Sequence, residues 1–146
     1  MTEFDLAIYE IDLYGFTIVE EVMTQEEVAS FLDVLIRLDK EVGEGRPGPG
    51  SCRHVANLPT LDPIFFSIID HPRILPLLEH YLEPSLILGS LNSRIVRPGD
   101  DNQGFHSDIP VEMLNMASPV MMNTVWFLDD FSRVNGGTRI VPGTHK

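Results

Sequence analysis

A histidine and an aspartate two residues apart, His106 and Asp108, are the residues of this chain best suited to chemistry. On extended backbone, side chains at i and i+2 point to the same face, so one ion could meet both the imidazole and the carboxylate. These ligand types suit a borderline divalent metal such as Fe(II), which a facial triad of two histidines and one carboxylate binds with open positions. A short motif of this kind also occurs by chance in loops, so its surroundings decide between the two interpretations.

Further motifs surround this pair. An Arg97-Pro98-Gly99 turn precedes it, Gln103 stands three residues before the histidine, and the segment NGGTRIVPGTH ends at His145. The combination resembles the phytanoyl-CoA dioxygenase family of Fe(II)- and 2-oxoglutarate-dependent oxygenases. The resemblance also includes the GFTIV and TQEE segments near the N-terminus and therefore covers nearly the whole chain.

The resemblance assigns roles to five residues. His106 and Asp108 would be two of the three iron ligands. Gln103 and Thr138 match positions that contact the carboxylates of 2-oxoglutarate in one branch of the family, and Arg53 matches an arginine near the site that could bind substrate. The alternative for Gln103 is a turn-stabilising amide, and for Thr138 an ordinary strand threonine, because both residue types often bond to neighbouring backbone.

Arg97 is a further candidate for binding a substrate or cosubstrate anion, because a guanidinium matches a carboxylate in bidentate fashion. For both Arg53 and Arg97 the simpler interpretation is a solvated surface arginine, since arginine is mostly exposed in proteins. A similar choice exists for large apolar residues late in the chain, which could line a substrate cavity but are more typical of a core. These residues are Met121, Met122, Trp126 and Phe127.

The resemblance also implies a reaction. A carboxylate at Asp108 favours hydroxylation or a related oxidation such as desaturation, because halogenating relatives have a small residue at this position. The expected partners are a small organic or acyl substrate and O2. Two alternatives stay open: a non-catalytic cupin-like remnant that binds a metal or ligand, and a different ion such as Zn(II) or Ni(II) in the same site.

The third metal ligand is missing from the pattern. His145 is the only histidine after His106, and the interval between them has room for only about three strands of typical length, too few for a jelly roll. We therefore expect His145 to have a structural or loop-anchoring role. In the family the distal histidine and the arginine that pairs with 2-oxoglutarate come later, so both would fall beyond Lys146, and the chain resembles the front part of a longer enzyme with impaired activity.

Size and composition are compatible with one globular domain over residues 1–146, since 43% of the residues are hydrophobic. Ten Lys and Arg stand against 22 Asp and Glu, and a net charge of -12 repels nucleic-acid phosphates and anionic lipids. No apolar run approaches the roughly 18 residues that span a bilayer, and the N-terminal MTEFD lacks the basic start of a signal peptide. The single cysteine, Cys52, cannot form an internal disulfide, which fits a reducing compartment, so we expect a cytoplasmic protein. The acidic charge and the lack of a long apolar run predict no nucleic-acid or membrane partner.

Local patterns predict the first elements of the chain. Residues 12–19 are rich in β-branched and aromatic side chains and predict a short strand entered through a turn at Gly15. Thr24 and Glu27 form a capping box, which predicts that a helix begins there. The apolar residues that follow have helical spacing: Val28, Phe31, Leu32, Leu35 and Leu38.

The rest of the chain changes character from helix to strand. Gly43 to Gly50 is rich in glycine and proline and predicts a surface loop, Asp62-Pro63 predicts a helix start, and a short helix is expected near Ile74 to Leu82. Three strands are predicted at 86–96, 120–128 and 138–141. Helices first and strands later favour an α+β class. The resemblance makes this a double-stranded β-helix, a cupin-like jelly roll with the N-terminal helices packed on its sheet, incomplete at the C-terminus.

Overall fold

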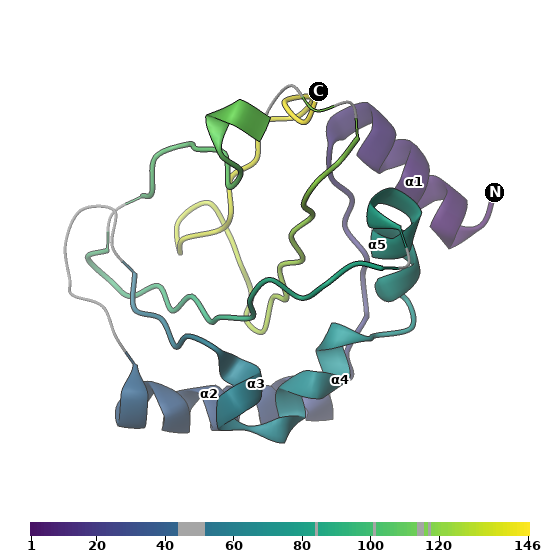
Figure 1. The fold of residues 1–146 in the computed structure, drawn as a ribbon. Coiled ribbons are helices and arrows are strands. Elements are labelled where there is room, and N and C mark those ends of the chain that lie inside the picture. Colours follow the sequence, from purple (N-terminus) through teal and green to yellow (C-terminus); the bar gives the residue numbers. More distant parts are fainter. Residues whose placement is uncertain (44–51, 84, 101, 114–115, 117) are drawn as a thin grey trace.

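The computed structural model describes residues 1–43, 52–83, 85–100, 102–113, 116 and 118–146. In Figure 1, α2 (Gln25–Val42), α3 (Leu58–Leu61) and α4 (Phe66–Ile69) lie along one edge, and α1 (Glu3–Tyr14) packs beside α5 (Leu75–Leu82). The C-terminal half winds between them, and its described residues form no strands. Except for Gly43, the predicted loop at Gly43 to Gly50 lies outside the described residues. None of the helices in the described part of the chain combines the length and apolarity needed to cross a bilayer.

The first element is a helix, α1 (Glu3–Tyr14), which the sequence did not predict. Thr2 and Asp5 form a capping box, so two backbone N–H groups at the helix start are satisfied. The strand predicted at 12–19 is wrong, because its first residues belong to α1 and the rest have no ladder partner. Tertiary packing stabilises the helix, since Tyr81 of α5 donates a hydrogen bond to Asp12 at 3.0 Å. Burial, with help from this bond, raises the pKa of Tyr81 to about 12.

The second helix confirms the capping-box prediction. Helix α2 (Gln25–Val42) begins after Thr24, whose hydroxyl accepts from the Glu27 backbone N–H while the Glu27 carboxylate accepts from Thr24. These bonds to the carboxylate hold the pKa of Glu27 below its usual value. The helix turns Phe31 and Leu38 inward, and both are 3% exposed.

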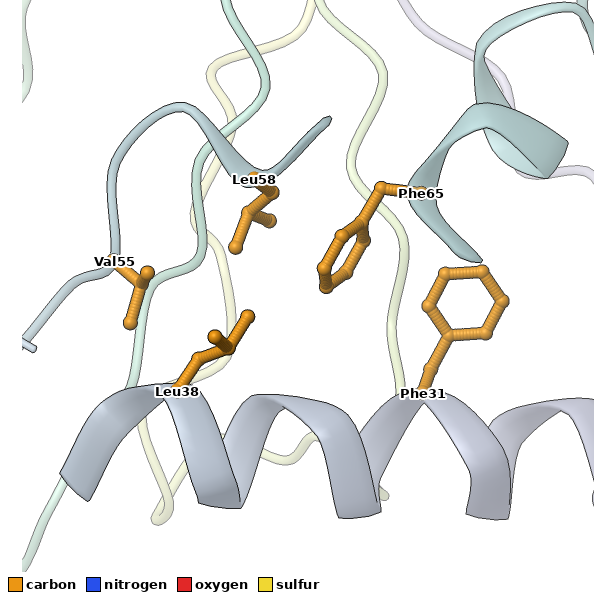
Figure 2. Close-up of a cluster of buried hydrophobic side chains, with 5 residues drawn as sticks. All are labelled: Phe31, Leu38, Val55, Leu58 and Phe65. Atoms are coloured by element: carbon orange, nitrogen blue, oxygen red, sulfur yellow. The ribbon is translucent and has the colours of Figure 1, made fainter. Parts of the chain in front are cut away.

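Short helical turns complete the core against α2. They are α3 (Leu58–Leu61), the 3-10 turn η1 (Pro63–Phe65) and α4 (Phe66–Ile69). Helix α5 (Leu75–Leu82) follows these turns and packs beside α1. The Asp62 side chain caps η1 by accepting from the Ile64 N–H at 3.0 Å, as the Asp-Pro pair predicted. Figure 2 shows the buried cluster that joins these turns to α2: Phe31, Leu38, Val55, Leu58 and Phe65.

The three predicted strands do not form in this structure. Segments 86–96, 120–128 and 138–141 contain no ladder, and a single antiparallel bridge joins Arg53 to Ile95. Around it, Ser93 N–H donates to Val55 carbonyl at 2.9 Å. A strand needs a neighbouring backbone to bond with, and β-rich composition alone does not supply one. The described residues therefore show no jelly roll, which stays a prediction from family resemblance.

The late apolar residues divide between partly buried and exposed positions. Met122 and Trp126 are partly buried, and the Trp126 ring meets the His71 ring edge-on with centroids 5.5 Å apart. Met121 and Phe127 are 42% and 48% exposed, so the expectation that they belong to the core is wrong in this structure. On extended backbone, neighbouring side chains face opposite ways, which fits the alternation of partly buried Met122, Trp126 and Leu128 with exposed Met121 and Phe127.

The turn that contains His145 packs on the end of α1. Gly143 N–H donates to the Tyr14 carbonyl at 2.8 Å, and a Cβ added at Gly15 would lie 2.5 Å from Nδ1 of His145. His145 thus has the structural, chain-anchoring place that the sequence suggested. The close approach is possible because residue 15 lacks a side chain.

We expect Gly15→Ala to destabilise the fold by about 2 kcal/mol, because an L-residue is strained at φ +86° and the new methyl collides with His145. Gly99→Ala is the matched control, since Gly99 has φ +94° but open space around it. The control should lose only about 1 kcal/mol, for the backbone strain alone. Urea unfolding of the variants measures both values, and equal losses would show that the His145 contact contributes nothing.

Candidate metal centre

His106 and Asp108 converge in the structure. The His106 Nε2 and Asp108 Oδ1 atoms lie 3.2 Å apart, and the two side chains are 49% and 53% exposed. Two ligand atoms at about 2.1 Å from one ion and at a right angle would be roughly 3 Å apart, so the observed separation fits adjacent positions on one metal.

The histidine ring is oriented by its other nitrogen. Nδ1 of His106 lies 2.9 Å from the Gly104 carbonyl oxygen. With the proton on Nδ1, the ring donates to this carbonyl and keeps the Nε2 lone pair toward Asp108. Metal-binding histidines commonly have such a partner on the second nitrogen, because it fixes both tautomer and ring orientation.

The carboxylate is oriented in the same way by a residue from another segment. The amide of Asn123 donates to Oδ2 of Asp108 at 2.6 Å, so the other oxygen, Oδ1, is the one that faces His106. Asn123 was not among the residues predicted for the site. In the sequence, Asn123 stands out only as a single amide in the mostly apolar run VMMNTVWFL. That pattern does not identify Asp108, 15 residues away, as its partner.

The two proposed 2-oxoglutarate contacts, Gln103 and Thr138, are exposed and belong to neighbouring segments. Arg139 donates to the Gln103 backbone carbonyl at 2.8 Å and lies over the Phe105 ring, with its guanidinium carbon 4.7 Å from the ring centroid. These contacts bring the segment that contains Thr138 next to the residues that precede His106. Arg139 was not among the residues predicted for the site.

Arg53 and Arg97 have an unexpected common partner. Asp39 of α2 is only 8% exposed, and its carboxylate pairs with Arg53 Nε and with Arg97 Nη2, the latter at 2.7 Å. Arg53 Nη2 also donates to the Asp39 backbone carbonyl at 2.6 Å. Arg97 is an exposed arginine, as expected, whereas Arg53 is only partly exposed. Both guanidinium groups make their polar contacts here with Asp39 rather than with the His106–Asp108 pair.

The described residues contain no cluster of three side chains from His, Cys, Asp and Glu that could hold a metal ion. His145 is among the described residues and lies against Gly15, so it does not join His106 and Asp108. The site seen here supplies two converging ligands.

Comparison with known proteins identifies the class. The sequence profile of phytanoyl-CoA dioxygenase (PhyH) matches residues 11–146, so the chain belongs to the phytanoyl-CoA dioxygenase family. The family assignment agrees with the resemblance seen in the motifs. No solved structure matches the chain significantly.

Three relatives illustrate the similarity. Uncharacterized protein Rv1501 of Mycobacterium tuberculosis is 26% identical over 99% of this chain and 57% of its own length. Dioxygenase af480 of Aspergillus fumigatus is 30% identical over 68% of the chain and 32% of its own length. Ectoine dioxygenase of Bordetella bronchiseptica is 26% identical over 94% of the chain and 47% of its own length. The chain thus spans about half the length of the curated relatives it matches.

Proposed function

We propose that this chain belongs to an Fe(II)- and 2-oxoglutarate-dependent dioxygenase that hydroxylates or otherwise oxidises a small organic or acyl substrate. The observation that carries the proposal is the convergence of His106 Nε2 and Asp108 Oδ1 at 3.2 Å, with the second polar atom of each side chain held by Gly104 and Asn123. Two relatives are named as dioxygenases, which supports the same reaction class. The jelly-roll fold and the cytoplasmic location are part of this proposal.

In this proposal each residue has a limited task. His106 and Asp108 hold Fe(II), and bound Fe(II) with 2-oxoglutarate supplies the oxidising power drawn from O2. The exposed amide of Gln103 and the hydroxyl of Thr138 can donate to the cosubstrate carboxylates. Arg53 can bind an anionic group only with the donors that Asp39 leaves free. The third metal ligand comes from outside the described residues.

Anaerobic addition of Fe(II) and 2-oxoglutarate tests this proposal. Chelation of the metal by 2-oxoglutarate is expected to give a weak visible charge-transfer band that is absent in His106→Ala. Metal bound without any band would favour the alternative, a non-catalytic cupin-like binding protein, for which the lack of a third ligand among the described residues is the supporting observation. Metal analysis of protein purified without chelator would show whether Zn(II) or Ni(II) occupies the site instead.

Gln103→Ala should weaken 2-oxoglutarate binding by about tenfold, the loss of roughly one hydrogen bond to a charged group. The substitution leaves the backbone carbonyl that accepts from Arg139 in place, so the chain path near His106 should be kept. Calorimetric titration of 2-oxoglutarate into the metal-loaded protein measures the change. Asn102→Ala, at the neighbouring exposed position, is the control. An unchanged cosubstrate affinity would remove Gln103 from the site.

A further inference from the structure

Asn123 makes a contact that links the metal centre to a distant segment. Its side chain comes from the run 120–128 and donates to Asp108 Oδ2 across 15 positions of sequence, at 2.6 Å. The amide can only donate through its nitrogen, so Oδ2 is the accepting atom of the Asp108 carboxyl group. The neighbouring side chains Met122 and Trp126 are partly buried, so the segment that presents Asn123 is itself fixed by packing.

A carboxylate can bind a metal through one oxygen or through both. Here one oxygen, Oδ2, is occupied by the Asn123 amide, and the other, Oδ1, lies 3.2 Å from His106 Nε2. An ion placed between His106 and Asp108 therefore meets Oδ1 first. Outer partners that orient a ligand in this way typically change metal affinity by about 10- to 100-fold when removed.

We propose that Asn123 is a positioning residue for the metal centre, which holds Asp108 in the orientation that binds the ion through Oδ1 alone. The inference rests on the proposed metal-binding function. One-oxygen binding by Asp108 leaves an additional coordination place on the metal, which a two-atom chelator such as 2-oxoglutarate needs.

The chemistry of the amide suits this task. Asn123 is neutral, so it orients the carboxylate without cancelling the negative charge that attracts a divalent cation. A lysine or arginine at this position would donate equally well but would repel the ion and compete for the carboxylate. A leucine of similar size would fill the space and donate nothing.

The experiment compares Co(II) binding, as an air-stable substitute for Fe(II), in wild type, Asn123→Leu, Asn123→Gln and Asp108→Ala. Calorimetry should give a dissociation constant 10- to 100-fold higher for Asn123→Leu and a value near wild type for Asn123→Gln, which keeps an amide donor. Thr124→Val is the matched control on the same segment, because no hydrogen bond of its hydroxyl is seen among the described residues. Its affinity should equal that of wild type.

A second measurement separates positioning from a general structural role. The splitting between the two carboxylate stretching bands in the infrared spectrum is wide for one-oxygen binding and narrow for two-oxygen binding. In protein with labelled aspartate, Asn123→Leu should narrow this splitting in the Co(II)-bound state, while its unfolding temperature without metal should match that of Thr124→Val.

The outcomes distinguish failure of the proposed metal centre from failure of the proposed role of Asn123. If Asp108→Ala binds Co(II) as tightly as wild type, the proposed metal centre fails, and the role of Asn123 fails with it. If Asp108→Ala loses binding while Asn123→Leu keeps wild-type affinity and splitting, the metal centre stands and the positioning role of Asn123 is refuted. Weaker binding with a narrowed splitting in Asn123→Leu, rescued in Asn123→Gln, supports the inference.

Discussion

In the dioxygenase to which we propose that this chain belongs, His106→Ala and Asp108→Ala are each expected to abolish the conversion of 2-oxoglutarate to succinate and to weaken Fe(II) binding by more than the 10- to 100-fold typical of outer partners. The reason is geometric. The two ligand atoms lie 3.2 Å apart, so either truncation removes half of the coordination that the described residues offer. Succinate release in the presence of Fe(II), 2-oxoglutarate and O2 measures the effect, and anaerobic metal titration gives the binding change separately.

Ser107→Ala provides the matched control for these two variants. Ser107 stands between the ligands, and on extended backbone its side chain points to the opposite face. Its hydroxyl accepts a long hydrogen bond of 3.4 Å from the Ile109 N–H, so its loss should change metal binding and turnover little. Turnover that persists in His106→Ala or Asp108→Ala would refute their assignment as ligands.

Features set by short sequence intervals could be predicted, and those set by distant partners could not. The Thr24–Glu27 capping box and the Asp62 cap involve residues within three positions of each other, so their side chains meet as soon as the helix forms. Thr2 and Asp5 carry the same capping signal at the start of α1, a helix that was not predicted.

The predicted strands failed for the opposite reason. Segment 86–96 has the composition of a strand, yet among the described residues its only bridge is the one between Ile95 and Arg53. Composition reports how well side chains suit an extended backbone, whereas a ladder requires another segment at the right place and register. Nothing local to the sequence identifies that segment.

The candidate site also combines a local feature that the sequence predicted with long-range contacts that it did not predict. The i and i+2 spacing of His106 and Asp108 predicted their convergence, because strand-like backbone alone brings the side chains together. Asn123 and Arg139 reach the site from 15 and 36 residues away, so only the fold reveals them. The pairing of Arg53 with Asp39 is equally long-range, and the general exposure of arginine gave the wrong expectation for its environment.

The ion pair between Asp39 and Arg53 gives rise to the second large effect, a loss of stability. Asp39→Ala is expected to destabilise the fold by about 2–3 kcal/mol, because removing one member of a buried ion pair leaves the partner charges uncompensated. This free-energy loss is at or below the smallest losses typical of breaking a fully buried ion pair. The reason is that the Arg53 and Arg97 side chains are 27% and 53% exposed, so water partly solvates them. Urea unfolding followed by circular dichroism measures the loss.

The control for this variant comes from the same helix. Asp33→Ala removes an exposed aspartate of α2 for which no ion pair is seen among the described residues, so it tests the effect of helix composition alone. Its free energy of unfolding should stay within about 0.5 kcal/mol of wild type. Asp39→Asn keeps the shape but not the charge, and we expect an intermediate loss, because the amide oxygen can still accept from one arginine. Equal stability of the Asp39 and Asp33 alanine variants would mean that the arginines find sufficient solvation without Asp39. In that case both guanidinium groups would be available to bind an anion, and the substrate-binding role of Arg53 would gain support.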